Sequence, residues 1–141
     1  VIGQGACTDS NWAGQYHLPG TFAPIADYHM LETCVETAKE LGLPYHVGNI
    51  LSSDRFYGDD GDMPDGWKAN NAWAKMGVLA VEMEAAALYM NAARAGKRAL
   101  AICSISDNLI TGEELSADER QTNFTNMMKI GLEIAVKMAQ K

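Results

Sequence analysis

The sequence has few cysteines, few basic residues and no long apolar run. Its three cysteines, Cys7, Cys34 and Cys103, lie far apart, which excludes a C-x-x-C metal or redox pair and a disulfide framework. Lys and Arg number 11 against 18 Asp and Glu, a net charge of −7 that argues against a nucleic-acid partner. No apolar stretch approaches the roughly 18 residues of a membrane span. We therefore expect a soluble, cytoplasmic protein that binds neither membrane nor nucleic acid.

The length and the apolar content indicate one compact unit. A chain of 141 residues with 48% apolar residues can bury a single core. The sequence begins at Val1 and passes directly into the apolar stretch VIGQGAC. We expect from this opening that the chain is a portion of something larger.

Short apolar runs alternate with helical periodicity in the first half, which is typical of α/β proteins. The pattern predicts a helix over Ile25–Leu41, ended by a glycine, and a strand over Val47–Leu51. Ser52–Asn71 is rich in Asp and Gly and is predicted to form a surface loop. A short helix is expected around Trp67–Lys75.

The second half predicts a strand over Val78–Val81, a helix over Met83–Ala95 and a buried strand over Ala99–Ile105. Such a strand, helix, strand unit is expected to be parallel and right-handed. Ser116, followed three residues later by Glu119, predicts a capping box. Beyond it, helical periodicity continues to the end of the chain and predicts a long amphipathic helix.

Acidic residues follow two of the predicted strands. Glu82 and Glu84 stand where a strand passes into a helix, and Ser106 and Asp107 follow the next strand in AICSISDN. In open α/β sheets the carboxyl ends of strands form the edge where ligands bind. Two alternatives remain at this point: acids in a first helical turn are favoured by the helix dipole, by about 0.3–1 kcal/mol each, and Asp readily caps a turn.

Arg120 and Phe56 also allow two interpretations. A cation near a helix N-terminus opposes the helix dipole, so Arg120 either serves the site or pairs with Glu113, Glu114 or Glu119. Phe56, in the DRFY stretch after a strand, either stacks on a planar ligand or covers the core.

Five motifs occur along the chain in the order ACTDS, VGNILSSDRFY, AVEMEAAALY, ICSISDN and SADERQTNF. In order and approximate spacing they resemble the hexameric, bacterial-type purine nucleoside phosphorylases. The resemblance implies a three-layer α/β/α fold with a mixed central sheet, phosphorylase/hydrolase-like. It also implies that residues 1–141 are the C-terminal portion of a single nucleoside phosphorylase domain, whose N-terminal phosphate-binding half lies outside this sequence.

The resemblance implies that six residues bind the nucleoside, namely Phe56, Val81, Glu82, Met83, Glu84 and Ser106. Glu84 would bond the ribose hydroxyls and Met83 would pack beneath the sugar. Val81 and Glu82 would border the sugar and base pocket. Phe56 would lie against the purine face, with Ser106 beside the base.

Two further residues are implied to be catalytic. Asp107 would act as general acid toward the purine, and Arg120 would be the helix-borne cation that moves toward Asp107. One departure from the family pattern is Asn108, where histidine is frequent. A second is a longer acidic loop after Tyr57.

The expected reaction is reversible phosphorolysis of purine (deoxy)ribonucleosides in purine salvage. The implied partners are the nucleoside, inorganic phosphate as co-substrate and further copies in a homohexamer, without metal or organic cofactor. Cleavage of the glycosidic bond makes the sugar cationic and the base anionic, which suits a carboxylate at the hydroxyls and an acid at the purine. A hydrolytic nucleosidase of the same superfamily and a non-catalytic nucleoside-binding module remain as alternatives.

Overall fold

The computed structural model describes residues 1–56 and 68–140, apart from the side chains of residues 122 and 123. The elements, in chain order, are β1 (Ile2–Thr8), the 3-10 helix η1 (Trp12–Tyr16), α1 (Tyr28–Glu40), β2 (Val47–Ser52), α2 (Ala69–Lys75), β3 (Ala80–Glu82), α3 (Ala85–Arg94), β4 (Ala101–Ile102) and α4 (Ala117–Ala139).

The strands form one mixed sheet with the order β3-β2-β1-β4. The strands β1, β2 and β3 are parallel, in a register that aligns Cys7 with Leu51 and Leu51 with Val81. The fourth strand, β4, is antiparallel to β1. The predicted α/β class with a mixed sheet is therefore confirmed.

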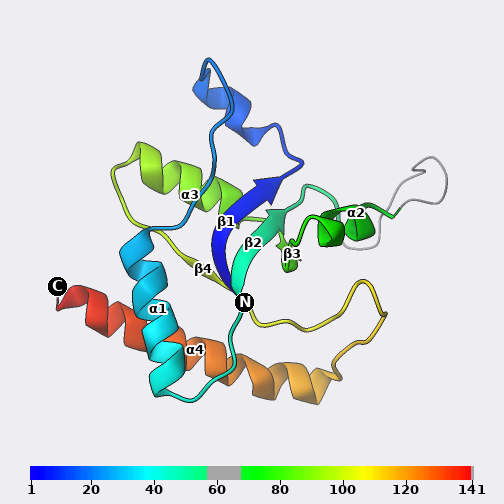
Figure 1. The fold of residues 1–141 in the computed structure, drawn as a ribbon, viewed down its shortest axis with the longest axis vertical. Helices are drawn as coiled ribbons and strands as arrows, with labels where there is room; N and C mark the ends of the chain where they lie inside the picture. Colours follow the sequence, from blue (N-terminus) through cyan, green and yellow to red (C-terminus); the bar gives the residue numbers. More distant parts are fainter. Residues whose placement is uncertain (57–67, 141) are drawn as a thin grey trace.

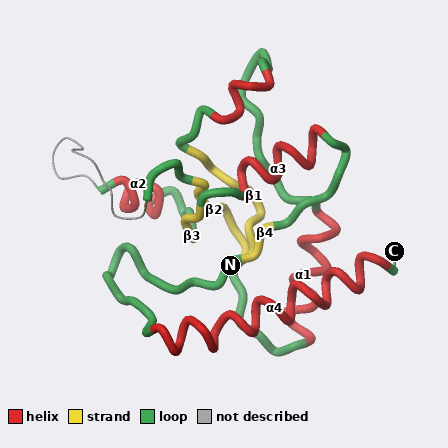
Figure 2. The backbone as a smooth tube through the Cα atoms, turned by 180° about the vertical axis from the view of Figure 1, so that it is seen from behind, coloured by secondary structure: helices red, strands yellow, loops and turns green. Residues whose placement is uncertain are grey.

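Helices cover both faces of this sheet, as Figure 1 and the reverse view in Figure 2 show. The neighbouring residues Ile2 and Gly3 point to opposite faces, because successive strand residues alternate. Ile2 packs in a cluster with Cys34 of α1 and Ile130 of α4. A Cβ on Gly3 would instead meet the side chain of Tyr89 on α3. The layers are therefore α3, the sheet, and α1 with α4, as predicted.

Tyr89 joins α3 to two strands and explains where β4 lies. Its buried hydroxyl donates to the Gly3 carbonyl at 2.5 Å and accepts the Ala101 N–H at 2.9 Å. A side chain at position 3 would crowd this contact, because a Cβ there would lie 2.8 Å from Cδ1 of Ile50 and 3.0 Å from the Tyr89 hydroxyl. The hydroxyl thus adds a side-chain link from α3 to the pairing of β4 with β1.

The predicted parallel unit over residues 78–105 is wrong. The strand expected over Ala99–Ile105 is short, and it joins the sheet at the edge away from β3. Val1 and Cys103 exchange two backbone hydrogen bonds, of 2.7 and 2.8 Å, which fix the antiparallel direction. The pairing partner of β4 is thus the start of the chain, far away in sequence.

Capping residues set the helix starts. The helix predicted from Ile25 begins at Tyr28, because the Asp27 carboxylate accepts the Met30 N–H at 2.9 Å. The capping box of Ser116 and Glu119 is present at the start of α4, as predicted. No helix within the described ranges is both long and apolar enough to cross a membrane. The acidic part of the predicted 52–71 loop, and Tyr57, lie outside the described residues.

Candidate nucleoside site

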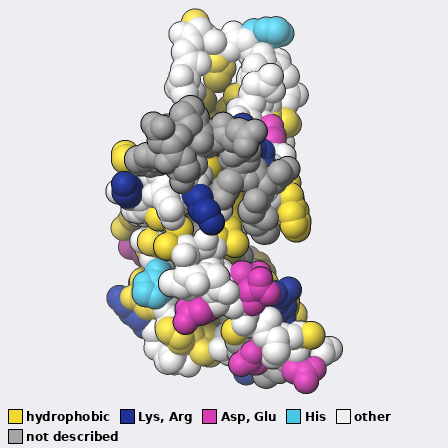
Figure 3. All heavy atoms as spheres, turned by 90° about the vertical axis from the view of Figure 1, so that its right-hand side faces the viewer, with side chains coloured by type: hydrophobic (Ala, Val, Ile, Leu, Met, Phe, Trp, Pro, Cys, Tyr) yellow, Lys and Arg dark blue, Asp and Glu magenta, His cyan; other side chains and the backbone are white. Residues whose placement is uncertain are grey.

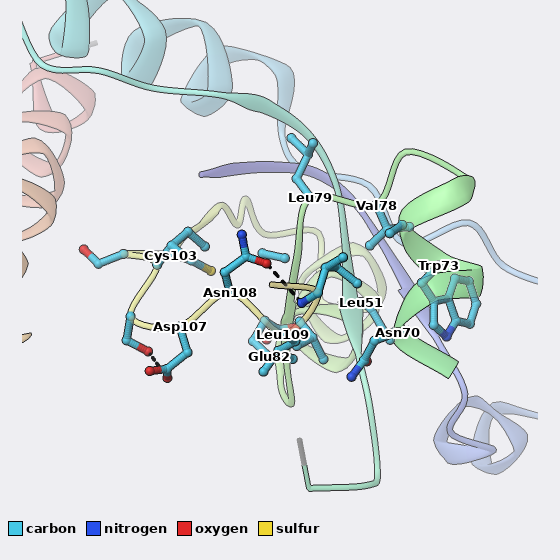
Figure 4. A pocket seen from close by; sticks show the side chains of 17 residues that line it. Leu51, Asn70, Trp73, Val78, Leu79, Glu82, Cys103, Asp107, Asn108 and Leu109 are labelled. Carbon is cyan, nitrogen blue, oxygen red and sulfur yellow. Dashed lines mark hydrogen bonds between the residues drawn. The ribbon is translucent and has the colours of Figure 1, made fainter. Parts of the chain in front are cut away.

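A cavity of about 390 Å³ lies between β3 with α2 on one side and the segment after β4 on the other. Four of the predicted site residues line it: Val81, Glu82, Ser106 and Asp107. Figure 4 shows that they come from separate parts of the chain, with Glu82 from the β3 side and Asp107 from the loop beyond Cys103. Of the acids predicted at two strand ends, Glu82 and Asp107 therefore meet at one cavity, although β4 runs opposite to the expected direction.

The carboxylate of Asp107 is held from both sides. The Ser106 hydroxyl donates to its Oδ2 at 2.6 Å, and Arg120 donates from Nη2 to its Oδ1 at 2.7 Å. The Arg120 Nε also donates to the Leu115 carbonyl at 3.1 Å, which fixes the plane of the guanidinium. Charge-assisted bonds of this kind are short and directional. The arrangement fixes the orientation of the Asp107 carboxylate.

A closed loop supports Asp107. The Leu115 N–H donates to the Ser106 carbonyl at 2.9 Å, and the Asn108 N–H donates to the Glu113 carbonyl at 2.7 Å. The Asn108 side chain accepts the Ile110 N–H at 3.0 Å, the kind of turn that Asn forms readily. The residue that departs from the family pattern thus stabilises the loop that carries Asp107.

Arg120 comes from the first turns of α4, in an acidic surrounding. Figure 3 shows acidic side chains gathered in the lower part of one face, where Figure 1 places the start of α4 and the preceding loop. The exposed acids there include Glu113, Glu114 and Glu119. The ion pair of Arg120 within the described residues nevertheless goes to Asp107. The alternative that Arg120 pairs with those glutamates is wrong.

Glu82 has a well-defined local role. Its Oε2 accepts the Glu84 N–H at 2.8 Å and the Ala85 N–H at 2.7 Å. Its Oε1 accepts the hydroxyl of Ser52. Acids at a helix N-terminus satisfy amides that lack a partner in the helix. Glu82 therefore has a structural role at the start of α3, although it lies before the first helical turn rather than in it, and it also lines the cavity.

Glu84 and Met83 are more exposed than Glu82. The Glu84 carboxylate accepts the Met83 N–H at a long 3.3 Å. Met83 is 41% exposed and lines a second hollow of about 70 Å³ together with Ser52 and Asp54. The Glu82 carboxylate is therefore held by two short backbone bonds, whereas the exposed Glu84 carboxylate has one long one.

Phe56 is 73% exposed, so the interpretation that it covers the core is wrong. The turn before it is braced by Asp9, whose carboxylate accepts the Ser53 hydroxyl at 2.8 Å and the Asp54 N–H at 2.9 Å. Sequence reasoning missed Asp9 and Ser52 as supports of the site. The available signal for Ser52 was the polar S-S-D run at the end of a buried strand.

Cys103 contributes to the cavity wall. Burial raises the pKa of its thiol, and the negative charge of Glu82 raises it further. The protonated thiol therefore behaves as a small, nearly apolar wall group rather than as a nucleophile.

The mixed α/β sheet thus carries a cavity lined by Ser106 and Asp107, with Arg120 paired to Asp107, and this arrangement is compatible with the phosphorylase class. The profile of the phosphorylase superfamily matches residues 2–139, and the chain belongs to that family. It is 48% identical over 133 residues to the DeoD-type purine nucleoside phosphorylase of Tolumonas auensis, covering 94% of this chain and 54% of that protein. It is 47% identical over 138 residues to the protein of the same name from Clostridium beijerinckii, covering 98% and 56%.

A solved structure shows the same fold. The purine nucleoside phosphorylase of Toxoplasma gondii, in complex with immucillin-H, superposes with a TM-score of 0.79 at 19% identity. The superposition covers 99% of this chain and 55% of that one. The chain thus spans about half the length of the curated relatives and of the solved structure that it matches.

Proposed function

We propose that this chain forms the nucleoside-binding part of a purine nucleoside phosphorylase, which cleaves purine (deoxy)ribonucleosides reversibly to the free base and (deoxy)ribose 1-phosphate. One observation carries the proposal: Asp107, held between Ser106 and Arg120, shares a cavity with Val81 and Glu82 at the end of β3. The two relatives with this printed activity support it.

The proton chemistry follows from the Asp107 contacts. As the glycosidic bond breaks, the base gains negative charge, and a proton from Asp107 neutralises it. Transfer leaves Asp107 as a carboxylate, which the Arg120 guanidinium at 2.7 Å stabilises. The arginine thereby favours the state in which the proton is on the purine, and the Ser106 hydroxyl holds the other carboxyl oxygen at 2.6 Å.

The sugar chemistry belongs to the turn after β3. In the proposal Glu84 bonds the ribose hydroxyls and stabilises the cationic sugar, Met83 packs beneath the ring, and Val81 borders the pocket. Phe56 lies against the purine face. The exposure of Met83, Glu84 and Phe56 supports these roles, since a side chain that binds a ligand must be accessible.

Phosphate is proposed to bind to groups outside this chain. Anions bind readily at free helix N-termini, but the three longest helices of the described residues are capped by their own chain. Asp27 caps α1, Glu82 caps α3 and Ser116 caps α4. The remainder of a longer polypeptide or a neighbouring subunit of a homohexamer supplies the anion site. The proposed place of the reaction is the cytoplasm.

The test compares two forms of the protein. The 141-residue chain is assayed alone and joined to the preceding part of the Tolumonas auensis relative, here called the joined protein. We expect the chain alone to show little phosphorolysis of inosine or adenosine, because the proposed anion site lies outside it, and the joined protein to cleave them with phosphate. Robust turnover by the chain alone would contradict the division of the site. If turnover by the joined protein did not depend on added phosphate, a hydrolytic nucleosidase would be favoured instead. If the joined protein bound nucleosides without cleaving them, a non-catalytic binding module would be favoured.

A further inference from the structure

The carboxylate of Glu82 is almost entirely used within the chain. A carboxylate has about four acceptor positions, and three are filled by the Ser52 hydroxyl and by the Glu84 and Ala85 amides. A group engaged in this way has little capacity left for a ligand hydroxyl. Glu82 is therefore better suited to fixing the backbone of the turn than to binding the sugar.

Ser52 connects this cap to the sheet. It is the last residue of β2, is 5% exposed and stands in register with Glu82 on β3. Its hydroxyl donates to Glu82 and accepts the Ala86 N–H at 2.8 Å. The Ser53 N–H adds a bond to the Glu82 carbonyl at 2.9 Å. Together these contacts join the end of β2 to the first turn of α3.

The two residues enclosed by these contacts are those proposed to meet the sugar. Met83 and Glu84 lie between Glu82, whose carboxylate caps α3, and the first residue of that helix. The Glu84 N–H is itself one of the bonds to Glu82, so the backbone from which the Glu84 side chain departs cannot turn without breaking it. The direction of the Glu84 carboxylate therefore depends on a cap that Ser52 holds in place.

We propose that Ser52 is a positioning residue of the sugar site, which acts through Glu82 to fix the turn that carries Met83 and Glu84. The inference rests on the proposed function, because it takes Glu84 as the ligand of the ribose hydroxyls. It assigns Glu82 a different part from Glu84: Glu82 holds the turn, and Glu84 contacts the substrate.

The test is Ser52→Ala in the joined protein, with kcat and KM measured for inosine and 2′-deoxyinosine. Loss of position at Glu84 should reduce kcat/KM for inosine on the order of 10–100-fold, as small displacements of binding groups do. The loss for 2′-deoxyinosine should be clearly smaller, because one hydroxyl that Glu84 would bind is absent. Ser52→Thr keeps the hydroxyl and should recover the preference for inosine.

A matched control separates positioning from general destabilisation. Thr37, on α1 and away from the cavity, also has a buried hydroxyl. This hydroxyl accepts a hydrogen bond from Lys137 of α4 at 3.1 Å. Thr37→Val should lower thermal stability without changing the ratio of the two kcat/KM values. Glu82→Ala should change this ratio as Ser52→Ala does. The double variant should change the ratio little more than either single variant, because the two residues act as one unit.

Equal losses on both nucleosides in Ser52→Ala, or the same change of ratio in Thr37→Val, would overturn the inference while leaving the phosphorylase function intact. Additive effects of Ser52→Ala and Glu82→Ala would also overturn it, since independent residues would add. Failure of the unsubstituted joined protein to cleave either nucleoside would contradict the proposed function itself, and the inference with it.

Discussion

The Nη2 atom of Arg120 lies 2.7 Å from Oδ1 of Asp107, across 13 positions of sequence and between α4 and the loop after β4. The second oxygen of the same carboxylate receives the Ser106 hydroxyl. Both oxygens of Asp107 therefore have a defined environment, one cationic and one neutral.

Arg120→Ala should reduce catalysis more than stability. The side chains of the pair are 42% and 28% exposed, and such ion pairs contribute about 0–1 kcal/mol to folding. We expect a small fall in melting temperature but a clear fall in kcat/KM for inosine, milder than that of an Asp107 variant. Arg120→Lys keeps the charge, and its kcat/KM should lie between those of the unsubstituted joined protein and Arg120→Ala. Unchanged kinetics in Arg120→Ala would contradict a role in proton transfer.

Glu84→Ala should weaken binding of the cationic sugar in the transition state. Removal of a charge-assisted hydrogen bond should cost about 2–4 kcal/mol, measured as the change in kcat/KM for inosine. Glu82→Ala should cost less, because Glu82 acts through the backbone. The substrate control is a 2′,3′-dideoxynucleoside: if the unsubstituted joined protein handled it as well as the parent nucleoside, Glu84 would not be the ligand of the hydroxyls.

Tyr89→Phe should destabilise the fold. The variant would leave the Gly3 carbonyl and the Ala101 N–H without their bonds to the hydroxyl, at a cost of about 1–3 kcal/mol. Urea unfolding followed by circular dichroism measures this change. Tyr16→Phe is the matched control, because its hydroxyl bonds Asn91 at an exposed position and should matter by less than about 0.5 kcal/mol. Comparable losses in both variants would show that Tyr89 has no special part in holding β4.

Local features of the fold could be predicted from the sequence, and long-range ones could not. The capping box of Ser116 and Glu119 depends on residues three apart, so its pattern is sufficient. The direction of β4 depends on the pairing of Cys103 with Val1 and on the Tyr89 hydroxyl, which no local periodicity records. The predicted length of this strand was wrong for the same reason.

The same distinction holds at the site. The sequence placed Glu82 and Glu84 at a strand end, and the structure confirms that position. Spacing could not decide which carboxylate turns back onto the helix amides, because this depends on the hydroxyl of Ser52 in the neighbouring strand. The resemblance to known phosphorylases predicts that Asp107 and Arg120 act together, and the structure shows their direct contact.

The most direct measurement compares two substrates in Asp107→Asn. The base of inosine must be protonated as it leaves, whereas the base of 7-methylguanosine already carries a positive charge. We predict that Asp107→Asn in the joined protein slows inosine cleavage by roughly 10²–10⁴-fold, the usual contribution of general acid catalysis, and affects 7-methylguanosine much less. Equal losses of kcat/KM on the two substrates would contradict proton transfer from Asp107 and show that it only positions the base.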